Sequence, residues 1–169
     1  MVTTTSDVSN TSFLQPTGFK LVINRERFPN LEFFAQSVNH PAISTGPTQV
    51  PFRRSDVFFP GDKITYSTLD VDVILDEEMK IYEELHTWML GMVNQNFSNS
   101  LDQRLTDKDK SFYDIALNIL TSHNNLNRTV RYKDAFPTSL GNINFTSSQG
   151  GLQYVIVPVT FQFTTFNFV

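Results

Sequence analysis

Residues 69–93 read LDVDVILDEEMKIYEELHTWMLGMV, and within this stretch a strand pattern gives way to a helix pattern. In the first part, Asp70 and Asp72 alternate with apolar residues, which is the two-residue period of a half-buried strand. Further on, apolar residues recur every three or four positions, which is the period of an amphipathic helix. The residues expected to anchor the buried face of this helix are Ile81, Leu85, Trp88 and Met92.

The junction between the two patterns contains the expected start of the helix. Asp76 is predicted to be the N-cap, because its carboxylate can accept a hydrogen bond from an otherwise unpaired backbone N–H. Glu77 and Glu78 follow, where the helix dipole favours negative charge. Gly91 and Asn94 are the expected terminators.

The composition of the 169-residue chain favours one β-rich domain, because it contains 16 Phe, 13% aromatic residues and only 18% charged residues. We expect a polar N-terminal arm over residues 1–15 and a single β domain over residues 16–169. A net charge of -4 argues against a domain that grips nucleic acid through its phosphates. The chain has no cysteine, so disulfides and thiolate metal sites are excluded. We also expect neither a signal peptide nor a membrane anchor, because no long apolar run is present.

Residues 42–68 are interrupted by proline and glycine but carry apolar side chains between them. We expect a long loop here, and such loops in compact domains are usually functional or disordered. An exposed apolar patch usually marks an interface. Two alternatives remain open at this point, namely burial against another subunit and packing onto the chain's own core. The residues expected at an inter-subunit contact are Val50, Phe52, Arg53, Arg54, Val57, Phe58 and Phe59.

Further strands are expected on both sides of this region. Residues 19–23 and 31–38 are predicted to form a first hairpin, and residues 115–119 and 129–132 a second one. The segment that begins at residue 135 is predicted to be a loop with one short strand at residues 143–145.

The last apolar run, LQYVIVPVTFQFTTFNF at residues 152–168, is predicted to be a strand with one irregularity. Up to Phe163 the apolar residues of one face occupy odd-numbered positions, and after it Phe166 and Phe168 occupy even-numbered ones. This change predicts a bulge or bend near Thr164 and Thr165. Pro158 has no N–H to donate to a ladder, so the strand is expected to be at an edge or locally irregular there.

Catalytic and metal-binding patterns are weak throughout. His40, His86 and His123 are far apart in the sequence, and none has metal-ligand spacing with another. Asp107 begins a stretch similar to a calcium loop, but Phe112 occupies the position that requires glycine. We therefore predict that the chain is not an enzyme and uses no metal or cofactor.

Residues 60–89 and 135–168 together resemble the tail tube proteins of contractile-tailed bacteriophages. In that family, a Gly-Asp-basic turn leads into an alternating strand, an acidic helix cap and a helix that carries a tryptophan. Near the end of the chain, an aromatic-Pro-Thr segment precedes a short strand and a long aromatic one. The matching residues are Gly61, Asp62, Lys63, Asp76, Glu77, Trp88, Phe136, Pro137, Thr138, Ile143, Phe145, Phe161 and Phe166.

The resemblance implies a mainly β fold, namely an antiparallel β-sandwich or partial barrel with one flanking α-helix. It also implies hexameric rings whose inner strands join into a β-barrel around a channel for genome ejection. Rings would stack through the inter-ring loop at residues 42–68, with the tail sheath and baseplate or tail-terminal proteins as partners. The location would be the tail of the virion, after assembly in the host cytoplasm. Residues 1–15 and 94–111 depart from the family pattern, which leaves a tube initiator, terminator or adaptor as an alternative to the repeated subunit.

Two polar strand faces are candidates to line the channel. One carries Asp70 and Asp72, and the other carries Thr160, Gln162 and Thr164. Neutral or acidic side chains there would let DNA slide without binding. The alternatives to a phage tube are a secretion-system tube protein, a monomeric β-sandwich module that binds carbohydrate through exposed Tyr and Phe, and, as the weakest, an enzyme.

Overall fold

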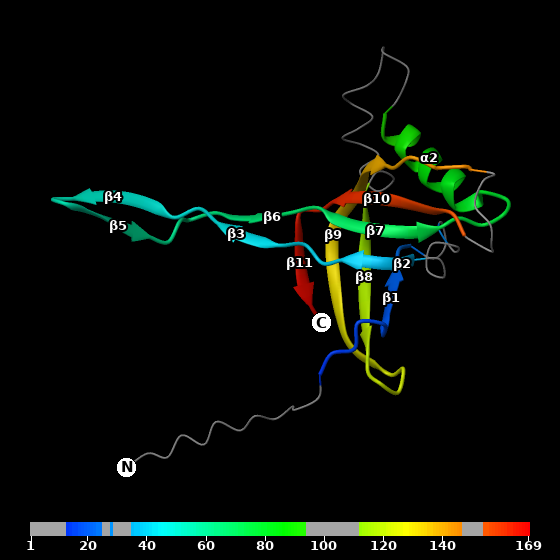
Figure 1. The fold of residues 1–169 in the computed structure, drawn as a ribbon, viewed down its shortest axis with the longest axis horizontal. Coiled ribbons are helices and arrows are strands. Elements are labelled where there is room, and N and C mark those ends of the chain that lie inside the picture. The colour runs from blue at the N-terminus through cyan, green and yellow to red at the C-terminus, as the bar shows by residue number, and fades with distance from the viewer. Residues whose placement is uncertain (1–12, 25–27, 29–34, 94–111, 147–153) are drawn as a thin grey trace.

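The computed structural model describes residues 13–24, 28, 35–93, 112–146 and 154–169 (Figure 1). Their regular structure is almost entirely β, with one helix in this part of the chain. The elements are β1 Phe19–Val22, β2 Ala35–Asn39, β3 Ile43–Thr45, β4 Thr48–Phe52, β5 Ser55–Phe59, β6 Ile64–Tyr66, β7 Leu69–Ile74, α2 Lys80–Met92, β8 Tyr113–Leu120, β9 Leu126–Leu140, β10 Ile156–Gln162 and β11 Thr165–Phe168.

Seven antiparallel strands form one folded sheet in the order β1-β8-β9-β10-β7-β2, with β11 beside β9. The 15-residue strand β9 belongs to both halves of this sheet. Its first part pairs with β8 and β11, and its last part pairs with β10. The two halves run across one another in Figure 1, as in an orthogonally packed partial barrel. The predicted mainly β, antiparallel fold with one flanking helix is confirmed.

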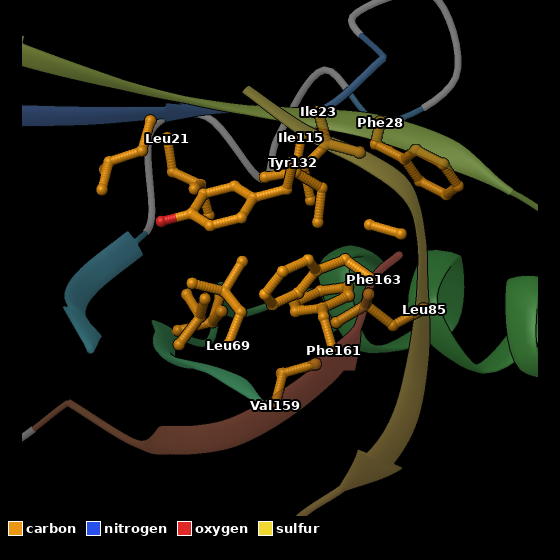
Figure 2. Close-up of a cluster of buried hydrophobic side chains, with 14 of the residues drawn as sticks. Leu21, Ile23, Phe28, Leu69, Leu85, Ile115, Tyr132, Val159, Phe161 and Phe163 are labelled. Atoms are coloured by element: carbon orange, nitrogen blue, oxygen red, sulfur yellow. The ribbon is translucent and has the colours of Figure 1, made fainter. Parts of the chain in front are cut away.

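The core lies between the two halves of the sheet, with α2 beside it. Leu69, Val71 and Val73 of β7 are buried, as their alternation predicted. Figure 2 shows Tyr132 and Phe163 from the two sides of the fold pointing into the same cluster. Burying each large apolar side chain contributes about 1.5–3 kcal/mol, so this cluster is the main source of the fold's stability. No helix in the described ranges is long and apolar enough to cross a membrane.

The helix begins later than predicted. Met79 occupies the N-cap position in a left-handed conformation with φ 54°, so the assignment of Asp76 as N-cap is wrong. The Asp76 carboxylate nevertheless accepts hydrogen bonds from the backbone N–H groups of Lys80 at 3.2 Å and Ile81 at 3.4 Å. An intervening turn, closed by a bond from the Met79 N–H to the Asp76 carbonyl, explains the delay. Gly91 lies inside the helix rather than at its end, so its assignment as a terminator is also wrong.

The predicted first hairpin is wrong as well. β1 pairs with β8 and β2 pairs with β7, at opposite edges of the sheet. Part of the predicted strand at residues 31–38 lies outside the described residues. Alternation tells which residues share a face but does not tell which strand lies beside it.

The second hairpin is confirmed, because β8 and β9 pair along their length. The loop expected from residue 135 is instead the end of β9, which continues to Leu140 and pairs with β10. Residues 141–146 contain no strand, so the short strand predicted at residues 143–145 is wrong.

The irregularity in the last run is confirmed. β10 ends at Gln162 and β11 begins at Thr165, and this break lets Phe166 reach the core despite the change from odd to even positions. Pro158 lies inside β10, one residue before the ladder with β9 begins at Val159 and Leu140, and its carbonyl accepts a hydrogen bond from the Gly141 N–H at 2.8 Å. On the β9 side, Pro158 is therefore at the end of the ladder, which agrees with the predicted local edge.

Candidate assembly surfaces

Residues 43–66 form a β-ribbon and not the predicted loop. β3 pairs with β6 and β4 pairs with β5, and the two ladders together project from the end of β2 and β7, away from the body (Figure 1). Every residue of β3, β4 and β5 is exposed. This exposure contradicts packing of β3, β4 and β5 onto the chain's own core, whereas Tyr66 of β6 is partly buried against it. We call residues 43–66 the ribbon.

The outer ladder of the ribbon has two different faces. Val50 lies opposite Val57, and Phe52 lies opposite Ser55. Directly opposed residues share a face, so one face is mainly apolar. The other face contains Gln49, whose side-chain amide donates a hydrogen bond to the Asp56 carboxylate. The apolar face consists of Val50, Phe52, Val57 and Phe59, which are 44%, 63%, 41% and 53% exposed.

The tip of the ribbon is positively charged. Arg53 and Arg54 form the turn between β4 and β5, and both are exposed. Arg53 has a left-handed backbone with φ 52°, which is unusual for a residue with a Cβ. Its guanidinium carbon lies 5.9 Å from the centroid of the Phe52 ring, within the range of a cation–π interaction. Phe58 is also exposed, but it lies on the opposite face from Phe52.

The outer face of β2, β7, β10 and β9 is mainly polar, with one opposed apolar pair, Ile74 and Ile156, at its end. Asp70 lies between Asn39 of β2 and Thr160 of β10. In the next row, the Ser37 hydroxyl donates a hydrogen bond of 2.6 Å to the Asp72 carboxylate. Because β7 and β10 are neighbours, the two faces treated as alternatives from the sequence are one continuous surface. We call this surface the polar face.

The remaining two candidate channel residues lie farther along the chain. Gln162 continues the outward side of β10 and lies opposite Phe136 of β9. Thr164 lies beyond the end of β10, where its backbone N–H donates to the Lys133 carbonyl at 3.0 Å. The polar face therefore brings together Asp70, Asp72 and Thr160, with Gln162 near its border and Thr164 outside it.

The helix anchors lie on one side of α2. Ile81, Leu85 and Trp88 are buried, and Met92 is partly buried against the core. The Trp88 ring stacks on Phe28 at a centroid distance of 4.9 Å. These contacts hold α2 against the end of the sheet.

The flank of α2 next to this buried side borders an open apolar groove of about 800 Å³. We call it the α2–β9 groove. Its walls include His86 and Leu90 of the helix and Phe136 and Leu140 of β9. Sequence reasoning missed this groove because it predicted a loop where β9 supplies one wall. Leu90, which is exposed and lies outside the predicted buried stripe, was the available signal.

A polar pair lies at the edge of the core. The Tyr132 hydroxyl is 2.7 Å from His40 Nδ1, and the His40 ring packs edge-on against Phe166. Burial raises the pKa of Tyr132 and lowers the pKa of His40. Both shifts favour the neutral forms, which is typical of a structural pair. Within the described ranges, no cluster of three or more His, Asp or Glu is placed to hold a metal ion.

The sequence model of the family described as phage tail tube protein matches residues 3–169, so the chain belongs to this family. The predicted resemblance is thereby confirmed. Membership assigns the chain a structural role in a tube. No curated protein matches the chain significantly.

Solved structures with the same fold come from contractile injection systems. The chain is similar to one in the anti-feeding prophage tube-terminating cap, with TM-score 0.67, 12% identity, and coverage of 100% of this chain and 99% of that chain. For a chain in the PVC sheath/tube terminator of an extracellular contractile injection system, the TM-score is 0.66 and the identity is 16%, with coverage of 95% of this chain and 99% of that chain. For a chain in the PVC sheath-tube complex in the extended state, the TM-score is 0.60 and the identity is 14%, with coverage of 99% of each chain. At these identities the likeness shows a shared fold.

Proposed function

We propose that copies of this chain form stacked hexameric rings of a phage tail tube, whose channel is the path for genome ejection. The observation that carries the proposal is the ribbon, which exposes an apolar face in a chain of the tail tube family. A two-stranded ribbon is marginally stable by itself, so it needs a partner surface. The next ring supplies that surface.

Ring formation has a physical basis in the sheet edges. Within the described residues, β1 and β2 each pair with one strand only. Unpaired edges of this kind are templates for a strand of a neighbouring subunit. In the proposed ring, the half-sheet containing β2, β7 and β10 joins its neighbours, and closure into a barrel removes the exposed edges. Residues 16–169 are the tube domain in this proposal, and residues 1–15 are an arm.

The polar face is the proposed lining of the channel. Asp70 and Asp72 repel the phosphates of a passing duplex, whereas Thr160 and Gln162 are neutral. Thr164, which was also a candidate from the sequence, lies outside this surface. A lining without cations offers DNA no counterion-releasing contacts, so DNA slides through without binding.

The ribbon is the proposed inter-ring contact. Val50, Phe52, Val57 and Phe59 are buried on stacking, whereas Arg53 and Arg54 lie at the rim of the contact. Tail sheath and baseplate or tail-terminal proteins are the proposed further partners. The tube is assembled in the host cytoplasm and becomes part of the virion tail.

A second candidate is the tube of a contractile system that injects cargo other than a phage genome. The fold similarity to chains in two structures of one extracellular contractile injection system, PVC, over 95% or more of this chain, favours it. Gene neighbours separate the candidates, because a phage tail requires capsid and genome-packaging genes nearby and an injection system does not.

The test is negative-stain electron microscopy of the purified chain at increasing concentration. Hexameric rings or long tubes with a central channel are expected, and single rings that never lengthen indicate a terminator. A strictly monomeric protein at high concentration overturns the proposal.

A second test uses a variant in which residues 47–60 are deleted, so that Gly46 is followed directly by Gly61. This deletion removes β4 and β5, the outer ladder of the ribbon. The backbones of these two glycines lie against one another, which allows a short connection there. Rings that no longer stack are expected from this variant.

A further inference from the structure

We infer that the apolar face of the ribbon of one copy docks into the α2–β9 groove of a second copy in the adjacent ring. The inference rests on the proposed stacking and names the surface that receives the ribbon. The ribbon and the groove are both present on the described chain. The proposed occupant of the groove is therefore a second copy of this protein.

The two surfaces match in chemistry and in size. The groove is lined mainly by apolar side chains, including Leu90, Phe136 and Leu140. Its volume of about 800 Å³ is comparable to pockets that hold drug-sized molecules. The side chains of Phe52 and Val57 therefore have room in it. Burial of both apolar surfaces in one contact removes each of them from water.

Electrostatics also favour contact between the ribbon tip and the groove. Val93, at the C-terminal end of α2, lines the groove, and the last turn of the helix contains no basic residue. The C-terminal end of a helix carries partial negative charge on its unpaired carbonyl groups, and this charge favours a nearby cation. The ribbon tip brings Arg53 and Arg54 to this position. The charges of the two surfaces are therefore complementary.

The direction of the ribbon also favours a second copy as the partner. The ribbon reaches one extreme of the long axis of the molecule, whereas α2 lies on the opposite side of the body (Figure 1). A ribbon held in this way cannot fill the groove of its own chain. A second copy displaced along the same axis brings its groove to the ribbon. Such a head-to-tail contact uses two different surfaces and repeats without closing, which is the geometry that a growing stack requires.

Disulfide trapping tests the contact directly, because the chain has no cysteine of its own. Phe52→Cys and Leu90→Cys proteins are prepared separately, mixed, assembled and oxidised. A cross-linked dimer containing one chain of each kind is expected. Ser122→Cys, in the exposed turn between β8 and β9, replaces Leu90→Cys in the control mixture and is expected to give no such dimer.

A charge variant provides a second measurement. Leu90→Asp is expected to form rings that do not lengthen into tubes, because it places a carboxylate in the groove. Leu126→Asp is the control, since Leu126 is 62% exposed at the far end of β9. It is expected to leave tube length unchanged.

The outcomes distinguish a failure of the groove assignment from a failure of the proposed tube function. If the unmodified chain forms tubes, but Phe52→Cys does not cross-link to Leu90→Cys and Leu90→Asp stacks normally, the groove assignment is overturned and the tube proposal stands. If the unmodified chain forms neither rings nor tubes, the proposed function fails and this inference fails with it.

Discussion

Replacing Trp88 by alanine is expected to lower the free energy of unfolding by about 3–5 kcal/mol, the usual cost of removing a buried tryptophan. The side chain is only 3% exposed. Its ring stacks on Phe28 at 4.9 Å and meets Tyr113 edge-on at 5.1 Å. Each aromatic pair adds about 0.5–1.5 kcal/mol beyond the buried area, which favours the upper part of the range. For a chain of this size the melting temperature falls by roughly 6–20 °C.

Urea unfolding followed by far-UV circular dichroism measures this loss. Fluorescence cannot be used, because Trp88 is the single tryptophan and the variant lacks it. The variant that joins Gly46 to Gly61 is a suitable background, since stacking would otherwise add to the apparent stability. Leu90→Ala is the control on the same helix, where the 44% exposed side chain predicts a loss of less than about 1 kcal/mol. A loss of less than about 1 kcal/mol for Trp88→Ala would refute the role of α2 as a packed cover of the core.

Three further perturbations test other parts of the molecule. Asp76→Ala removes the carboxylate that accepts from the first backbone N–H groups of α2, and a loss of about 0.5–2 kcal/mol is expected by urea unfolding. Asp70→Lys combined with Asp72→Lys is expected to leave tubes visible by microscopy but to reduce plaque counts, because cations in the channel bind phosphates. Burial lowers the pKa of His40 below 6.5, so the unfolded chain gains a proton before the folded one as the pH falls. Stability is therefore expected to decrease below about pH 6.5, and His40→Asn is expected to lack this component in urea titrations.

Controls decide each of these cases. Asp76→Asn retains an acceptor without the charge, so its loss is expected to be smaller than that of Asp76→Ala, and equal losses would contradict the capping role. Lysines at the exposed positions Ser122 and Asn125 should leave infection unchanged, and normal infection with lysines at Asp70 and Asp72 would exclude the polar face from the channel. A pH profile of His40→Asn that matches the unmodified protein would contradict the burial argument.

The sequence predicted the elements that bury one face and failed for those whose environment depends on distant partners. The alternation in β7 and β10 identified their core sides, and the period of α2 identified its buried side. Partner strands were not predictable, because β1 and β2 are close in the sequence but lie at opposite edges of the sheet. The pairing of each is decided by long-range contacts that no local pattern contains.

The candidate surfaces were predicted in part for the same reason. The apolar residues of the ribbon were expected at an inter-subunit contact, and this stays a prediction. The two ladders were not expected, because proline and glycine interrupt the segment and because β4 and β5 are exposed along their whole length, so neither strand buries one face. The segment from residue 135 was expected to be a loop, yet residues 135–140 belong to β9 and Pro137 pairs with Phe161 in the β9–β10 ladder. The α2–β9 groove exists only after that strand has formed, and this explains why no sequence pattern identified it.

The ribbon and the polar face are parts of one structure. β2 is followed almost directly by β3, and β6 is followed almost directly by β7, so the two strands of the inner ladder continue two strands of the polar face. Ser67 and Ala42 join them, since the Ser67 N–H donates to the Ala42 carbonyl at 3.0 Å and the Ala42 N–H donates to the Ser67 hydroxyl at 2.8 Å. These two hydrogen bonds therefore couple the ribbon to β2 and β7. In the proposed tube, the contact that sets the position of the next ring would in this way also align the channel linings of successive rings.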